Sequence, residues 1–335
     1  MKRPADRHPL TNAKAFRNAL SQWFDTEGKT YPWRLTEDPW AILVSEIMLQ
    51  QTTVASVIAN QRFERFMEEF PDVDTIAGAP ESKILRAWEG LGYYNRVRNL
   101  QKTAQVIVSE NEGRFPKSAA LLEKLPGIGR YTAGAVSSFA FNEPAPIVDG
   151  NIARVLARLF DFDTQIDSSA GQKEIWKWAS ELLDKESPRR FNSALMELGQ
   201  TYCGAREVHC VDCPVGGFCQ TQSPLSLPVK KPRKKFVKVA EHAFLILKNN
   251  KILLSKGSGS RRRGFWHLPL RSEDESARFE EESQHRYTIT RYRVTVHLYR
   301  VNSSTRMKGE EFHPLDSLEE LPIASPVRKI IKASL

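Results

Sequence analysis

The chain has 335 residues, more than one compact domain usually holds, so its length favours two folded units. Hydrophobic residues make up 41% of the sequence and aromatic residues 10%. This composition is sufficient for packed cores and excludes disorder over most of the length. Lysine and arginine outnumber aspartate and glutamate by 49 to 40. The resulting charge of +9 suits a polyanionic partner, although a solvated basic surface would have the same composition.

The first residues, MKRPADRHPLTNAKAF, contain no apolar run after their basic residues. No later segment approaches the ~20 consecutive apolar residues that a helix needs to cross a bilayer. We therefore expect a soluble, intracellular protein without a secretion signal or a transmembrane segment.

Residues 10–222 have the periodicity of successive helices joined by short turns. The first pattern, NAKAFRNALSQWFDTEG, has one apolar face and ends at Gly28. The second starts with Asp38 as its cap and Pro39 as its first residue, and we expect it to continue through WAILVSEIMLQQTTVASVI. Similar patterns follow as far as KEIWKWASELL, without strand-like alternation, so this part predicts a mainly helical domain.

A glycine turn, Pro126-Gly127-Ile128-Gly129, separates two of these helices. Glycine tolerates positive φ and exposes its amide, so Gly127 and Gly129 can direct N–H groups at a phosphate oxygen beside a helix N-terminus. A single G-x-G also occurs in ordinary helix turns. Twenty residues later, Asp149 begins the helical pattern VDGNIARVLARLF, where it reads by itself as a helix cap.

All four cysteines lie in one short segment, as Cys203, Cys210, Cys213 and Cys219, with the spacing C-x6-C-x2-C-x5-C. Clustered thiols in an intracellular chain indicate a metal or cluster site before disulfides. Zinc sites more often pair two C-x-x-C arms across a longer insert, so the compact loop favours an iron–sulfur cluster. Zinc and unligated core cysteines remain the alternatives.

The composition changes at SPLSLPVKKPRKKFVK, residues 223–238, which we interpret as a basic linker. Two apolar runs around an Asn-Asn turn follow, and then the alternating segment ITRYRVTVHLYRV and the helical pattern SPVRKIIKAS. Residues 239–335 therefore predict a smaller mixed α/β domain. The basic runs at 230–235 and 261–263 would add phosphate contacts or simply carry solvated charge.

Together, the hairpin LPGIGRYTAGAV, the segment VDGNIARVLARLF and the cysteine loop resemble the helix-hairpin-helix superfamily of DNA glycosylases that carry a [4Fe-4S] cluster. A closer similarity to the MutY-type adenine DNA glycosylases covers residues 13–220 and includes PWR, SEIMLQQT and LGYYNRVRNL. In the C-terminal part, GFWHLP and LPIASPVRKII resemble the Nudix-like domain of that family. The resemblance implies a helix-hairpin-helix glycosylase fold with a cluster loop, followed by a Nudix-like domain.

Breaking an N-glycosidic bond requires a proton for the departing base and negative charge near the sugar as it becomes an oxocarbenium ion. Glu46 has Ile42, Leu43 and Leu49 on its helix face, so desolvation should raise its pKa and keep it protonated, unless it is a surface glutamate. Asp149, near helix amides, should stay ionised. The resemblance assigns the same roles: Glu46 protonates adenine at N7, and Asp149 stabilises or traps the sugar cation.

Tyr131 bears on the type of reaction. In related glycosylases that also cut the strand, a lysine at this position attacks the sugar as an amine, and tyrosine cannot form that Schiff base. We therefore expect a monofunctional enzyme in which water completes hydrolysis, without strong AP lyase activity. The resemblance implies that Tyr131 supports Asp149 by hydrogen bonding and that Asn151 orients the water or the aspartate. Packing on the helix face is the alternative role for Tyr131.

An extruded base leaves a gap in the duplex. Gln51 and Tyr93 match positions from which the family inserts side chains as wedges into this gap. Alternatively, Gln51 lies on a plain helix surface and Tyr93 packs in the core. By resemblance, the DNA contacts are Gln51, Thr52, Tyr93, Gly127, Gly129 and Arg130, and the base pocket contains Trp33, Arg34 and Val54.

Several recognition positions depart from the family pattern. Tyr31 replaces the usual leucine before PWR, and Ser193 replaces a glutamine or glutamate that contacts the adenine edge. The family's Phe-Ser-His loop, which touches 8-oxoguanine, corresponds here to Ile289, Thr290 and Arg291, of which Thr290 keeps a hydroxyl and Arg291 a donor. Since no Nudix metal motif follows GFWHLP, this domain is expected to recognise a lesion without hydrolase activity.

These observations predict a base excision repair glycosylase that releases adenine opposite 8-oxoguanine or guanine. The alternatives are the same chemistry on another base or opposite another lesion, and a mismatch-binding protein without activity. We expect a monomer that binds double-stranded DNA containing a mispair, does not bind membranes and, in a bacterium, lies in the cytoplasm with the nucleoid.

Overall fold

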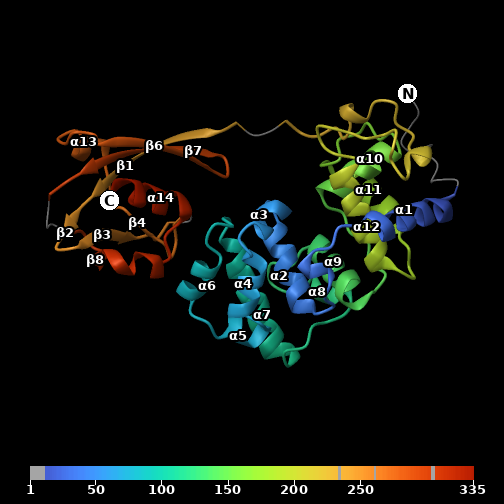
Figure 1. Ribbon diagram of the computed structural model, residues 1–335, viewed down its shortest axis with the longest axis horizontal. Helices are drawn as coiled ribbons and strands as arrows, with labels where there is room; N and C mark the ends of the chain where they lie inside the picture. The colour runs from blue at the N-terminus through green and yellow to red at the C-terminus, as the bar shows by residue number, and fades with distance from the viewer. Residues whose placement is uncertain (1–11, 233–234, 260–261, 303–305) are drawn as a thin grey trace. The chain divides into compact units, whose positions relative to one another are not determined.

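The computed structural model describes residues 12–232, 235–259, 262–302 and 306–335 (Figure 1). The chain forms two compact units, of which the first combines Met1–Ala77 with Asn99–Pro232 and the second combines Gly78–Arg98 with Arg233–Leu335. The change of unit near residue 233 falls within the segment interpreted as a linker. Of the predicted features, residues 10–11, Arg233, Lys234 and Arg261 lie outside the described residues.

The first unit is helical, as predicted. Its helices are α1 (Ala13–Glu27), α2 (Pro39–Leu49), α3 (Val54–Ile58), α4 (Arg62–Glu69), α5 (Val73–Ala77), most of α7 (Asn95–Asn111), α8 (Ala119–Leu122), α9 (Arg130–Phe141), α10 (Gly150–Leu159), α11 (Ser169–Leu182) and α12 (Pro188–Thr201). Short 3-10 turns cover Pro32–Arg34, Gly216–Phe218 and Pro224–Ser226. In the part of the chain that the structure describes, every helix is too short or too polar to cross a lipid bilayer.

Two groups of helices build this unit. Helices α1, α10, α11 and α12 pack around a core in which the rings of Phe160 and Trp178 stack 4.3 Å apart, while α2 and α8 pack against α9 (Figure 1). Burial of each large apolar side chain contributes about 1.5–3 kcal/mol, so the axis of α10 is firmly held. Because α9 also contacts α12, residues from both groups meet at one place.

Helix α2 ends earlier than its sequence pattern predicted. Asp38 caps its start by accepting hydrogen bonds from the backbone N–H groups of Trp40 and Ala41, as expected. The expected continuation to Ile58 is wrong, because α2 stops at Leu49 and α3 begins anew after Thr53, whose side chain accepts from the Ser56 amide. The intervening loop exposes Gln51 and leaves Glu46 within the last turn of a buried helix.

The second unit is mixed α/β, which confirms the predicted fold class. Its elements are α6 (Glu81–Ala87), β1 (Val237–Leu245), β2 (Leu247–Lys248), β3 (Lys251–Lys256), β4 (Trp266–His267), β5 (Leu270–Arg271), α13 (Glu273–Ser276), β6 (Ser283–Ile289), β7 (Tyr292–Arg300), β8 (Glu310–Pro314), a 3-10 turn (Leu315–Glu320) and α14 (Ser325–Ser334). One sheet has the order β5-β1-β7-β6, and in the other β3 pairs with β2, β4 and β8. Strands β1 and β7 are parallel, whereas β6 and β7 form a hairpin in which Ile289 pairs with Tyr292.

Segment 78–98 is joined to the sheets by specific contacts within this unit. Arg328 of α14 donates to both carboxylate oxygens of Glu89, at 2.6 and 2.9 Å. The rings of Tyr94 and Phe265 lie 4.2 Å apart. This packing brings Tyr93 and the β6–β7 turn into one unit, although about two hundred residues separate them in the sequence.

Candidate active site

Glu46 is a buried carboxyl group with only 4% of its surface exposed. Almost every other residue of α2 is apolar and buried, and the Tyr131 hydroxyl donates a hydrogen bond of 2.7 Å to Glu46 Oε2. Desolvation raises the pKa of Glu46 to about 7, with Asp149 adding to the rise and Tyr131 and Arg34 opposing it. The apolar neighbours in the sequence therefore predicted the direction of this shift correctly.

Asp149 is the N-cap of α10, and both of its carboxylate oxygens accept hydrogen bonds. The Ile152 amide donates to Oδ1 at 2.6 Å, and Asn151 Nδ2 donates to Oδ2 at 2.9 Å. These bonds lower the pKa of Asp149, as expected from the helix amides, but desolvation of the carboxyl group outweighs them and the net pKa is raised. The residues next to Asp149 in the sequence did not indicate this desolvation, which depends on how the folded chain buries the carboxyl group.

Arg154 fixes the orientation of Asn151, a connection that sequence reasoning missed. Its Nη2 donates to Asn151 Oδ1 at 2.8 Å and to the Gly199 carbonyl at 2.5 Å, while Nε donates to the Cys203 carbonyl at 2.7 Å. With its oxygen held by the guanidinium, the Asn151 amide turns its NH2 group towards Asp149. The signal available in the sequence was an arginine inside the apolar pattern of α10.

Tyr131 is half-buried, and its hydroxyl contacts Glu46. The expectation that it supports Asp149 by hydrogen bonding is therefore corrected, because the structure gives its hydrogen bond to the other carboxyl group. Burial and the charges of Glu46 and Asp149 raise the pKa of Tyr131 well above its usual value, which keeps the phenol neutral.

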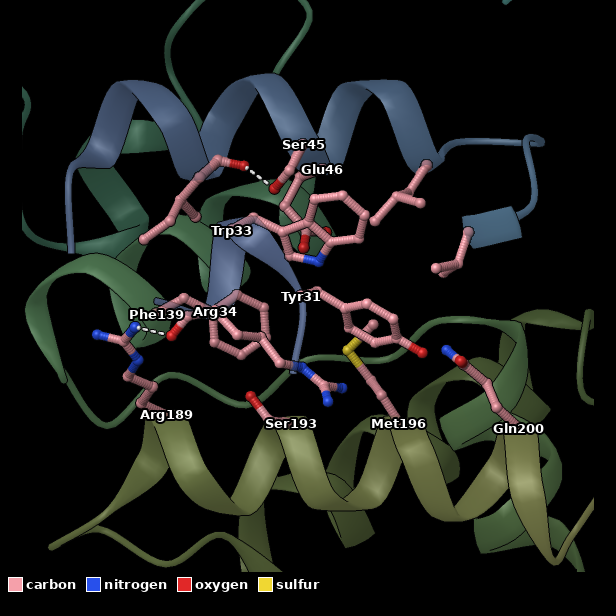
Figure 2. A pocket seen from close by; sticks show the side chains of 13 residues that line it. Tyr31, Trp33, Arg34, Ser45, Glu46, Phe139, Arg189, Ser193, Met196 and Gln200 are labelled. Carbon is pink, nitrogen blue, oxygen red and sulfur yellow. Dashed lines mark hydrogen bonds between the residues drawn. The ribbon is translucent and has the colours of Figure 1, made fainter. Parts of the chain in front are cut away.

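A narrow pocket opens into a wider groove, and Glu46 lines both. The pocket lies between α2, which carries Ser45 and Glu46, and α12, which carries Arg189, Ser193, Met196 and Gln200 (Figure 2). The predicted base-pocket residues Trp33, Arg34 and Val54 all line it. The groove is lined by Gln51, Thr52, Tyr131, Asp149 and Asn151, among others. Two carboxyl groups from separate helices thus face one continuous space.

Aromatic side chains and a buried ion pair form the pocket wall. The Tyr31 ring stacks on Trp33 at 5.3 Å, and the Arg34 guanidinium lies 4.8 Å from the Tyr31 ring centre. Arg34 forms an ion pair with Glu197, which is fully buried and also accepts from the Lys29 amide at 2.8 Å. Glu197 is a functional candidate that sequence reasoning missed, since a glutamate within a helix is normally assigned to the surface.

The glycine hairpin precedes α9. Gly127 has a φ of 77°, and a Cβ atom there would lie 2.6 Å from Asn99 Cβ, so this position requires glycine. Gly129 is the N-cap of α9 with an ordinary φ of −96°, and both glycines are exposed. The Arg130 guanidinium lies 3.8 Å from the Trp176 ring centre, which holds it beside the start of α9.

Three of the predicted DNA-contacting residues have left-handed backbone conformations. Gln51, Tyr93 and Thr290 have φ values of 56°, 48° and 52°. Non-glycine residues in this region are uncommon, and such strain is concentrated at functional sites. Tyr93 is 42% exposed, which argues against core packing, and Gln51 lies in a loop, which argues against a plain helix surface.

In the second unit, Tyr93 and Thr290 line a common cavity together with Arg96 and Phe265. Thr290 occupies the tight turn of the β6–β7 hairpin. Arg291 follows it in that turn and does not line the cavity within the described residues; its guanidinium lies 5.5 Å from the Tyr292 ring centre. The two predicted lesion-contacting residues therefore differ in their surroundings.

The four cysteines lie close together after α12. Burial and the three other thiols raise the pKa of Cys213 to about 11, and Arg158 Nη1 donates to Cys203 Sγ at 3.2 Å. Across the described ranges, no three His, Cys, Asp or Glu side chains are close enough to hold a single metal ion.

Comparison with known proteins agrees with this geometry. Residues 44–181 match the family described as HhH-GPD superfamily base excision DNA repair protein. The chain is 40% identical over 222 residues to the human adenine DNA glycosylase, covering 64% of this chain and 40% of that protein. It is 37% identical to an adenine DNA glycosylase of Buchnera aphidicola, covering 72% of this chain and 69% of that protein. The chain thus spans less than half the length of its mammalian relatives.

Solved structures show the same fold. A thermostable thymine-DNA glycosylase superimposes with a TM-score of 0.56 at 29% identity, covering 62% of this chain and 95% of that one. Endonuclease III in a non-covalent complex with DNA gives a TM-score of 0.52 at 26% identity, with the same coverage. The first unit therefore has the helical fold of these DNA glycosylases, and the chain belongs to the adenine DNA glycosylase family within the HhH-GPD superfamily.

Proposed function

We propose that this protein is a monofunctional DNA glycosylase of base excision repair that hydrolyses the N-glycosidic bond of adenine mispaired with 8-oxoguanine or guanine. The observation that carries the proposal is the pair of carboxyl groups, Glu46 and Asp149, facing one continuous space from separate helices. The similarity of the chain to adenine DNA glycosylases supports the choice of base.

Glu46 is the general acid. Its pKa of about 7 keeps a large fraction protonated near neutral pH, where it can transfer a proton to adenine N7 in the narrow pocket. Protonation makes the base a better leaving group. The pocket wall of Tyr31, Trp33 and Arg34 holds the extruded base against this acid.

Asp149 stabilises the sugar as positive charge develops at C1′. Its two oxygens accept from the Ile152 amide and Asn151, and such donors favour the carboxylate over the acid. Asn151 holds that carboxylate towards the groove. Water then completes hydrolysis at C1′, and the neutral phenol of Tyr131 cannot form the imine that strand cleavage by β-elimination requires.

The surrounding surface binds double-stranded DNA containing a mispair. Gly127, Gly129 and Arg130 contact phosphates beside the start of α9. Gln51 and Thr52 line the groove and contact the strand from which the base is extruded, as does Tyr93. Gln51 and Tyr93 act there as wedges that fill the gap in the duplex. Thr290 contacts the opposing lesion from the cavity that it shares with Tyr93, and Arg291 contacts the DNA beside it. We propose that the protein acts as a monomer.

Cys203, Cys210, Cys213 and Cys219 would hold a [4Fe-4S] cluster. When bound, the cluster would supply structural cross-linking of the loop that follows α12. Arg154 and Arg158, which donate to the Cys203 carbonyl and thiol, would tie this loop to α10 and so to Asp149.

A panel of duplexes tests the proposal. Each duplex carries A, T, C or U opposite G or 8-oxoguanine, and abasic sites are scored with and without alkali. We expect release of adenine alone, with strand breaks only after alkali. Release of another base would favour the same chemistry on a different substrate, and strand breaks without alkali would contradict the role of Tyr131. Binding without release of any base would show a mismatch-binding protein instead of an enzyme.

A further inference from the structure

A second hollow shares part of its lining, including Ser193, with the narrow pocket described above. It is lined by Phe24, Asn142, Ser187 and Arg190, and it shares Arg34, Arg189 and Ser193 with the narrow pocket. The two spaces therefore adjoin along one wall made of these three side chains. Figure 2 shows Ser193 on this wall, projecting from α12 between Arg189 and Met196.

The two arginines of this wall are held in place by other groups. Arg189 Nη2 donates to the carbonyls of Arg34 and Thr36 at 2.9 and 2.6 Å, and its Nη1 pairs with Glu37 at 3.0 Å. Arg34 is tied to Glu197, and its guanidinium lies 5.2 Å from the Phe24 ring centre. Of the three side chains that line both the pocket and the hollow, Ser193 is the shortest, and the two guanidinium groups are held by other partners.

The orientation of the base follows from the site itself. In the reaction proposed above, the sugar lies towards Asp149 in the groove, and purine N7 lies towards Glu46. In adenine, the exocyclic N6 is on the same edge as N7 and points away from the sugar bond at N9. That nitrogen is therefore directed to the end of the pocket formed by Arg189 and Ser193, away from Gln200, which lines both the pocket and the groove.

We propose that this pocket accepts adenines carrying a substituent on N6, with the substituent passing Ser193 into the hollow beside Phe24. This inference rests on the proposed function. The reaction is the same hydrolysis: the C1′–N9 bond breaks, the proton from Glu46 leaves with the base, water supplies the hydroxyl group at C1′, and the other proton of that water restores the Glu46 acid. No further reactant is required. A closed pocket would reject even one additional methyl group by about 10–200-fold.

Single-turnover rates on three duplexes test this proposal. Each has 8-oxoguanine opposite adenine, N6-methyladenine or N6-benzyladenine, and the measured quantity is the rate for each substituted base divided by the rate for adenine. For the wild-type protein we expect ratios within about tenfold of one, because the hollow is open beyond Ser193. Ser193→Gln should lower both ratios by at least about tenfold, since the longer side chain fills the passage. Ser193→Ala, which keeps the passage open, should leave the ratios as in the wild type.

Two results would overturn this inference and leave the proposed function intact. Adenine release with rejection of N6-methyladenine by more than about 100-fold would mean that the pocket is closed at N6. Unchanged ratios in a folded Ser193→Gln protein, checked by its melting temperature, would mean that the substituent does not pass Ser193. Failure to release adenine together with release of N6-methyladenine would correct the proposed substrate while supporting this inference. Failure to release either base would remove both proposals.

Discussion

The two carboxyl groups of the candidate active site are both desolvated, yet their surroundings differ. Glu46 lies on a buried, apolar helix and receives a hydrogen bond from a phenol, while half-buried Asp149 begins a helix and receives two N–H groups. Desolvation raises both pKa values, but the bonds to Asp149 oppose the rise through both of its oxygens. Burial alone therefore does not assign the acid and the anion, and the donors around each group make the distinction.

The largest expected effect comes from removing either carboxyl group while keeping its shape. Glu46→Gln and Asp149→Asn should each lower the single-turnover rate of adenine release by about 10²–10⁴-fold, because one abolishes proton donation and the other removes the charge that stabilises the sugar cation. Both variants should still bind mispaired DNA in a filter or fluorescence assay. A rate near that of the wild type in either folded variant would remove that residue from its role.

A pH series distinguishes the two groups by sign. In the proposed reaction Glu46 acts in its protonated form, so the rate should fall as the pH rises through about 7, by about tenfold per unit above it. Folded protein also retains this proton between the ordinary pKa of 4.5 and about 7, whereas unfolded chain has released it. The free energy of unfolding should therefore fall by about 3 kcal/mol as the pH rises through this window.

Glu46→Gln provides the control for the pH series, since it should remove that slope from the free energy of unfolding measured in denaturant. If the slope were the same in this variant, another group would be responsible for it.

Arg154→Lys tests whether Arg154 supports Asp149 through Asn151. Lysine keeps the charge but cannot bond simultaneously to Asn151, Gly199 and Cys203, so Asn151 loses its fixed orientation. We expect the free energy of unfolding to fall by about 2–4 kcal/mol and the rate by about tenfold or more. Arg65→Lys, on the exposed surface of α4, is the matched control. If the two variants had the same free energy of unfolding and the same rate of adenine release, Arg154 would have no role in supporting Asp149.

Tyr131→Phe should have the smallest effect. The lost hydroxyl stabilises ionised Glu46, so the pKa of Glu46 should rise and the descending limb of the pH–rate profile should move to higher pH by up to about one unit. An unchanged descending limb together with an ascending limb moved to higher pH would mean that the phenol stabilises the Asp149 carboxylate instead, as the sequence predicted.

Local sequence patterns were informative where a residue's surroundings come from its own helix. The apolar neighbours of Glu46 predicted its raised pKa, and Asp38, Pro39 and Gly28 gave the helix ends correctly. The hydrogen bond of Tyr131 could not be assigned in this way, because α2 and α9 are brought together only by the fold. The same holds for the desolvation of Asp149.

Charged residues inside helices were the main source of error. Arg154 and Glu197 are 8% and 0% exposed, although an amphipathic pattern assigns such residues to the surface. Each is buried because its partners come from other segments: Gly199 and Cys203 for the arginine, and Lys29 with Arg34 for the glutamate. The break between α2 and α3 was also missed, since the apolar periodicity continues across it.

Infrared difference spectroscopy of the protonated carboxyl stretch, recorded from pH 5 to 9, tests the central claim most directly. We predict a band that disappears with a midpoint near 7 in the wild type, that persists with a lower midpoint in Asp149→Asn because the charge of Asp149 helps to raise this pKa, and that is absent from Glu46→Gln. A band that survived in Glu46→Gln and vanished in Asp149→Asn would reverse the two roles. Loss of the Glu46 band near its ordinary pKa of 4.5 would leave the site without its acid at neutral pH.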